Sequence, residues 1–106
     1  MKGDCENEII KNVEYEDAER ELYKQLLAES IALRIELRYR YFENEKMPTY
    51  NQFYENSFDI LRLSKEEKED IYKKVDRYLI KERRLLMAND SKDKPIYLVD
   101  ARKGVK

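Results

Sequence analysis

The sequence predicts an all-α protein of three main helices, with a short extended or β segment near the C-terminus. Residues that interrupt helices are rare and lie near the ends of the chain or in two loops. They are Gly3, Gly104, Pro48 and Pro95. Apolar residues also recur at helical spacing over long stretches. Because 106 residues are enough for one core, we expect a single helical domain over residues 1–106, with flexible ends at 1–7 and 101–106.

The first predicted helix covers about residues 17–43. This segment contains no Gly or Pro, and acidic residues occupy its first turn, where they suit the positive end of the helix dipole. Ile9, Ile10 and Val13 also have helical spacing. Whether residues 8–16 continue the helix therefore stays open.

Two shorter helices are predicted over about residues 50–61 and 65–87. Each begins with a capping box. In this motif, a Ser or Thr side chain accepts a hydrogen bond from the backbone N–H three residues later, and the Gln or Glu side chain at that position accepts one from the backbone N–H of the Ser or Thr. The two boxes pair Thr49 with Gln52 and Ser64 with Glu67. They predict where both helices begin.

A short apolar run with β character follows Pro95. It consists of Ile96, Tyr97, Leu98 and Val99. The backbone of a strand needs hydrogen-bonding partners. Since no other segment indicates a strand, we expect this run to pair with the same segment of a second copy or with a sheet edge of another protein. Packing on the helices without pairing is the alternative.

The first helix carries apolar residues on two opposite sides, at about 100° per residue. The leucine stripe consists of Leu22, Leu26, Leu33 and Leu37. The isoleucine stripe consists of Ile31, Ile35, Tyr39 and Phe42, joined by Ala28 and Ala32. Two apolar sides imply cover on both, and the other helices can cover one. We predict a homodimer or partner seam along the isoleucine stripe, or along the leucine stripe if that one faces outward. Cover by the N-terminal segment is the alternative.

The third helix has a basic stripe nearly opposite its apolar side. The basic stripe consists of Lys73, Arg77, Lys81 and Arg84. Residues 73–106 carry 11 Lys and Arg against 5 Asp and Glu, although the net charge of the whole chain is −1. Such a stripe can contact phosphates or an acidic protein. The alternative is a solvated face whose cations suit the C-terminal end of the helix dipole.

The residue types argue against conventional catalysis. The chain has no His, hence no imidazole base and no Ser-His or Cys-His pair. No internal Gly is present for a phosphate-binding loop. An acidic cluster could hold a divalent ion, but one helix face is a poor cage, so we expect a solvated helix start without a metal. The cluster is Glu14, Glu16, Asp17, Glu19 and Glu21.

The single Cys5 forbids an intrachain disulfide and cannot form a zinc site alone. We therefore expect a reducing compartment, which is the cytoplasm or the inside of an infected cell. No apolar run is long enough for a transmembrane helix or a secretory signal.

These observations favour a small non-enzymatic interaction protein that occupies a partner's surface as a regulator, inhibitor or accessory subunit. It would use no cofactor, metal or small-molecule substrate. The expected partner or dimer face is Ile31, Ile35, Tyr39, Phe42, Ile96, Tyr97, Leu98 and Val99. The alternative is a nucleic-acid-binding protein that uses the basic stripe and the C-terminal tail. An enzyme with carboxylate–metal chemistry is the least favoured class.

Overall fold

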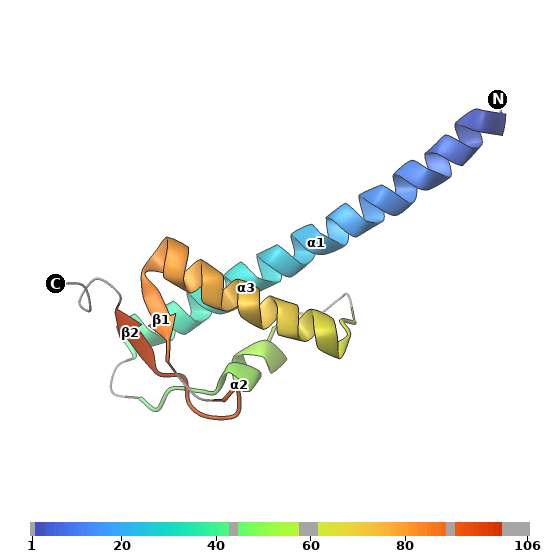
Figure 1. The fold of residues 1–106 in the computed structure, drawn as a ribbon. Coiled ribbons are helices and arrows are strands. Elements are labelled where there is room, and N and C mark those ends of the chain that lie inside the picture. Colours follow the sequence, from blue (N-terminus) through green and yellow to red (C-terminus); the bar gives the residue numbers. More distant parts are fainter. Residues whose placement is uncertain (1, 43–44, 58–61, 89–90, 101–106) are drawn as a thin grey trace.

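The computed structural model describes residues 2–42, 45–57, 62–88 and 91–100, with side chains described from residue 16 onward. Within these ranges the chain forms three helices and one small antiparallel sheet (Figure 1). The elements are α1 (Lys2–Tyr41), α2 (Tyr50–Glu55), α3 (Lys65–Arg83), β1 (Leu85–Met87) and β2 (Leu98–Asp100). The predicted fold class, mainly helical with a short C-terminal β segment, is confirmed.

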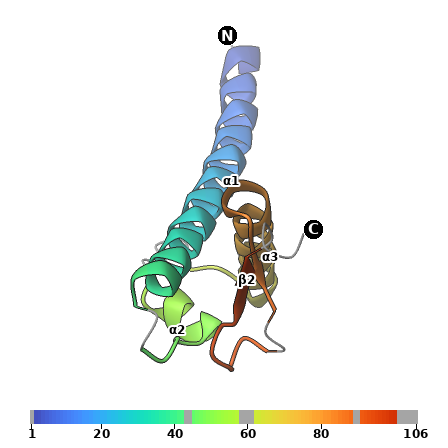
Figure 2. The same cartoon turned by 90° about the vertical axis from the view of Figure 1, so that its left-hand side faces the viewer.

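Helix α1 sets the shape of the molecule. Its 40 residues span about 60 Å at the usual helical rise, close to the longest extent of the molecule, 64 Å. Its C-terminal half packs against α3, and its N-terminal half projects away from the rest of the fold (Figures 1 and 2). Residues 8–16 therefore do continue the long helix. Residues 2–7, which we expected to be a flexible end, are helical as well.

Both shorter helices begin where the capping boxes predict. The Thr49 hydroxyl accepts a hydrogen bond from the backbone N–H of Gln52, which bonds back through its side chain. Ser64 and Glu67 do the same at the start of α3. Helix α2 ends at Glu55, earlier than the predicted residue 61, and residues 58–61 lie outside the described ranges.

The third helix is shorter than predicted because the chain turns at Arg84. Arg84 has a left-handed backbone, with φ 56° and ψ 36°, and its N–H caps α3 by donating to the carbonyl of Leu79. The next three residues leave the helix as β1. The prediction that residues 85–87 are helical is therefore wrong.

The predicted pairing of the C-terminal apolar run is confirmed, but its partner lies in the same chain. Strand β2 pairs with β1 in an antiparallel register that sets Val99 against Leu86 and Leu98 against Met87. Just before β2, the N–H of Ile96 donates to the carbonyl of Pro48, 3.1 Å away. The run is thus paired without a second copy, contrary to the partner that we predicted.

The core lies between α1, α3 and the β hairpin. Ile31 and Ile35 of α1 are fully buried, and the small Ala28 and Ala32 beside them let α3 approach closely. The other elements contribute further buried side chains, namely Tyr50, Leu63, Ile71, Val75, Leu79, Leu85, Met87, Ile96 and Leu98. The isoleucine side of α1 is therefore the core side.

Candidate functional site

Ile31 and Ile35 do not belong to a partner face. Both have 0% of their surface exposed, because α3 and the hairpin cover them within the chain. The seam that we predicted along these two residues is thus wrong. Most other members of the predicted partner face gather instead at one end of the molecule, where the end of α1 meets the segment leading into β2.

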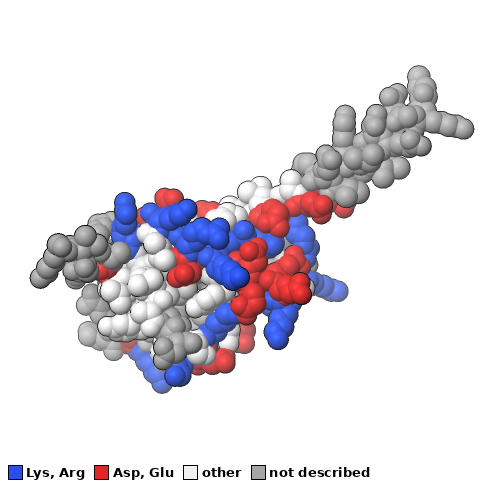
Figure 3. All heavy atoms as spheres, viewed as in Figure 1, with Lys and Arg blue, Asp and Glu red and all other residues white. Residues whose placement is uncertain are grey.

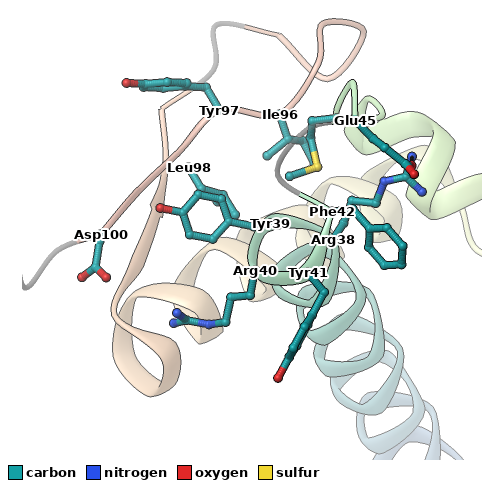
Figure 4. A pocket seen from close by; sticks show the side chains of 11 residues that line it. Arg38, Tyr39, Arg40, Tyr41, Phe42, Glu45, Ile96, Tyr97, Leu98 and Asp100 are labelled. Carbon is teal, nitrogen blue, oxygen red and sulfur yellow. Dashed lines mark hydrogen bonds and ion pairs between the residues drawn. The ribbon is translucent and has the colours of Figure 1, made fainter.

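These members line an open groove of about 550 Å³. One wall comes from the last turn of α1 and the residues after it, and the other from the segment entering β2 (Figure 4). The groove therefore joins segments about fifty residues apart in the sequence. Its lining residues are Arg38, Tyr39, Arg40, Tyr41, Phe42, Glu45, Met47, Ile96, Tyr97, Leu98 and Asp100.

Three aromatic side chains that line the groove are exposed. Tyr41 is 73% exposed, Tyr97 64% and Phe42 43%. Tyr97 alternates with the buried Ile96 and Leu98, so the extended backbone itself directs its ring outward. Tyr41 and Met47 were not among the predicted partner residues, and only the position of β2 beside the end of α1 brings them into this site.

The arginines at the groove already have partners. The Arg38 guanidinium lies 3.0 Å from a Glu45 carboxylate oxygen and 5.4 Å from the centre of the Phe42 ring. The Arg40 Nε donates to Glu36, 2.9 Å away. The groove therefore offers aromatic and aliphatic surface with neutralised charge, which suits an apolar side chain better than an anion.

Glu36 is a buried carboxylate of α1 that binds two arginines at this end of the molecule. It is 4% exposed and accepts hydrogen bonds from Arg40 and from Arg83 of α3, the latter at 2.6 Å. Burial acts to raise the pKa of Glu36, but the hydrogen bonds from Arg83 and Arg40 outweigh it and hold the pKa below its usual value. The carboxylate stays charged and fixes the end of α3 to α1.

Further ion pairs join α1 to α3 at the other end of their contact. Arg20 makes a bidentate pair with Glu67, with separations of 2.7 and 2.8 Å. The buried Lys24 lies 2.8 Å from Asp70. The hydrogen bonds from Arg20 lower the pKa of Glu67 to about 2. The hydrogen bond from Lys24 is the main cause that lowers the pKa of Asp70.

The leucine stripe lies on the side of α1 away from the core. Its four members are 43–58% exposed, and Figure 2 shows α3 and the hairpin on one side of α1 only. This is the arrangement in which our prediction assigned the seam to the leucine stripe. A row of half-exposed leucines along one helix is the kind of patch that marks an interaction surface.

The basic-stripe residues within α3 are Lys73, Arg77 and Lys81, and all three are exposed. Arg84, which we predicted on the same helix face, is also exposed but lies in the turn that ends α3. In the part of the chain that the structure describes, none of them belongs to an ion pair. Figure 3 shows Lys and Arg gathered along this part of the surface, with Asp and Glu gathered toward the other end of α3. Charge thus follows the helix dipole, as the alternative explanation requires.

The described residues contain no group of three His, Cys, Asp or Glu side chains that could hold a metal ion. Residues 16, 17, 19 and 21 of the acidic cluster are exposed. The side chain of Glu14 lies outside the described ones. Burial raises the pKa of the Tyr50 hydroxyl, whose ring packs edge-on against Tyr72 with centroids 4.7 Å apart. The Tyr50 ring therefore packs in the core beside Tyr72.

None of the described helices has a stretch apolar enough to cross a membrane. No family model, curated protein or solved structure is significantly similar to this chain.

Proposed function

We propose that this chain is a small non-enzymatic protein-interaction module, a regulator, inhibitor or accessory subunit, that binds a partner protein at the groove between the end of α1 and β2. The observation that carries this proposal is the group of exposed aromatic rings there. Tyr41, Phe42 and Tyr97 are 43–73% exposed around a groove of about 550 Å³. Exposed Tyr and Phe beside aliphatic side chains are typical of the centre of protein interfaces.

The chemistry of the groove suits an apolar partner segment. The groove is open at the surface, and its arginines are engaged by Glu45 and Glu36. An apolar or aromatic side chain from a partner can bury the rings without leaving a charge unpaired. We place the protein in a reducing compartment, the cytoplasm or the inside of an infected cell, since it carries a single Cys.

A pull-down from the native host tests the proposal. Phe42→Ser combined with Tyr97→Ser should abolish capture of the partner, because both rings leave the groove while the buried core stays intact. Tyr23→Ser is the matched control, since Tyr23 is 40% exposed on α1 away from the groove. Capture that needs neither ring would contradict the proposal, as would capture that disappears after nuclease treatment.

Nucleic-acid binding is the second candidate function, favoured by the four exposed cations of the basic stripe. It would be weak, salt-sensitive and indifferent to sequence, because a stripe of Lys and Arg contacts phosphates and does not read bases. Reversal of Lys73, Arg77, Lys81 and Arg84 to Glu should abolish it in an anisotropy titration with labelled DNA or RNA. Nanomolar, sequence-specific binding that survives this reversal would contradict our ranking of the two functions.

A further inference from the structure

The leucine stripe has a symmetry that its sequence positions reveal. Along the outer side of α1, Leu22, Leu26, Leu33 and Leu37 are preceded by Glu19 and followed by Arg40. These six positions follow one another at spacings of three, four, seven, four and three residues. At about 100° per residue, they all fall within about 60° of one another around the helix. The row therefore reads the same in both directions, except that a carboxylate stands at one end and a guanidinium at the other.

A row with this symmetry is complementary to itself when it is reversed. With a two-fold axis midway between Glu29 and Ser30, Leu22 stands level with Leu37 of the second copy, and Leu26 with Leu33. Glu29 and Ser30 flank the middle of the row, one on each edge. Ser30 is small and exposed, so it does not obstruct the approach of the second helix, and the carboxylate of Glu29 accepts a hydrogen bond from Gln25.

Charge selects the antiparallel direction. In that register Glu19 stands level with Arg40 of the second copy, so a carboxylate meets a guanidinium at both ends of the row. A parallel pair would set Glu19 beside Glu19 and Arg40 beside Arg40. Like charges at both ends disfavour the parallel pair.

The shape of the molecule leaves room for this arrangement. Helix α3 and the hairpin lie on the opposite side of α1, and the N-terminal half of α1 projects beyond them (Figures 1 and 2). In an antiparallel pair about this axis, the packed halves of the two α1 helices lie side by side, and the projecting half of each runs on past the C-terminal end of the other α1. The contact from residue 19 to residue 40 is about 33 Å long at the helical rise.

We infer that two copies of this chain associate through their leucine stripes, with the two α1 helices antiparallel and the two-fold axis between Glu29 and Ser30. This association does not use Phe42 or Tyr97, the proposed contacts of the groove, although Arg40 at the end of the row also lines the groove. A dimer of this kind carries two grooves related by the two-fold axis.

Light scattering and sedimentation equilibrium test the association in the full chain. At high micromolar concentration, the wild type should have twice the chain mass of 13.0 kDa. Leu26→Asp should weaken association by about a hundredfold, because the two-fold axis repeats the change. Ile80→Asp is the matched control, since Ile80 is 39% exposed on α3, and it should leave the dimer unchanged. A monomeric wild type, or a dimer that Leu26→Asp does not weaken, would overturn the inference.

Two further experiments test the direction. Glu19→Arg should weaken the dimer, because it sets a guanidinium beside Arg40 of the second copy at both ends of the row, whereas Glu19→Asp, which keeps the charge, should weaken it less. In a Cys5→Ser background, an equimolar mixture of Leu22→Cys and Leu37→Cys chains should form a mixed disulfide on oxidation, and neither should cross-link to itself. Self-cross-linking of Leu22→Cys alone would overturn the antiparallel direction. Phe42→Ser and Tyr97→Ser should not change any of these results, so this inference and the proposed function can fail separately.

Discussion

The two apolar sides of α1 consist of similar residues and have opposite surroundings. Ile31 and Ile35 are fully buried, whereas Leu33 and Leu37, on the other side of the same turns, are 43% and 51% exposed. The difference arises because α3 and the hairpin pack against one side of α1, and no other described element covers the other side. The stability of the fold therefore comes from the isoleucine side, and the leucine side is left for contacts outside the chain.

The largest expected effect comes from removing volume on the buried side. Ile35→Ala should lower the free energy of unfolding by about 2–5 kcal/mol, because it leaves a cavity where the helices meet. Leu37→Ala is the matched control two residues away, and it should cost less than about 1 kcal/mol. Urea denaturation of dilute protein measures both. Equal losses would mean that the two sides of α1 contribute equally to the fold.

A smaller effect is expected at the boundary between the two sides, where Glu36 holds Arg83 and Arg40. Glu36→Gln should lower the free energy of unfolding by about 1–2 kcal/mol at neutral pH, a modest loss because both arginines are partly exposed and can be hydrated.

Low pH should weaken the same kind of ion pair in the wild type. The folded-state pKa values of Glu36, Glu67 and Asp70 are lowered, so their pairs stabilise the fold above the unfolded-state pKa of about 4. That stability is lost as the pH falls through the folded-state pKa of each carboxylate. For Glu67 this folded-state pKa is about 2. Asp76, whose pKa burial raises, acts in the opposite direction. A free energy of unfolding that stays constant from pH 5 to about pH 2 would contradict this account.

The smallest effect concerns the turn that brings the hairpin over the buried side. Arg84 has a left-handed backbone, with φ 56°, which glycine adopts without a steric penalty. Arg84→Gly should therefore raise the free energy of unfolding by about 0.5–1 kcal/mol, measured by thermal or urea denaturation. Arg77→Gly, inside α3, should instead lower it by about 1 kcal/mol. A loss of stability in Arg84→Gly would mean that the side chain of Arg84 matters more than its backbone.

Local signals in the sequence predicted the fold well where the structure depends on neighbouring residues. The capping boxes at Thr49 and Ser64 place the starts of α2 and α3, since each box is completed within four residues. The end of α3 could not be predicted in this way. Arg84 is not the glycine that usually marks such a turn, and Leu85–Met87 are good helix formers that become a strand only because β2 lies beside them.

The candidate surfaces were predictable only in part. Both stripes of α1 follow from periodicity, but which one is buried depends on where α3 packs. Ala28 and Ala32 were the available signal, since small residues mark the side where another helix approaches closely. Tyr39 and Phe42 were expected to share a face with the C-terminal apolar run, and the structure brings them together at the groove. The inclusion of Tyr41 and Met47 depends on tertiary packing.

The most direct test of the central claim is to remove the leucine stripe and measure the fold that remains. A variant with Leu22, Leu26, Leu33 and Leu37 all changed to Gln should keep the helical circular-dichroism signal and unfold cooperatively. Compared with dilute wild type, each change should lower the free energy of unfolding by less than about 0.5 kcal/mol. Loss of the cooperative transition, or a total loss larger than that of Ile35→Ala, would contradict the claim that the leucine side lies outside the fold.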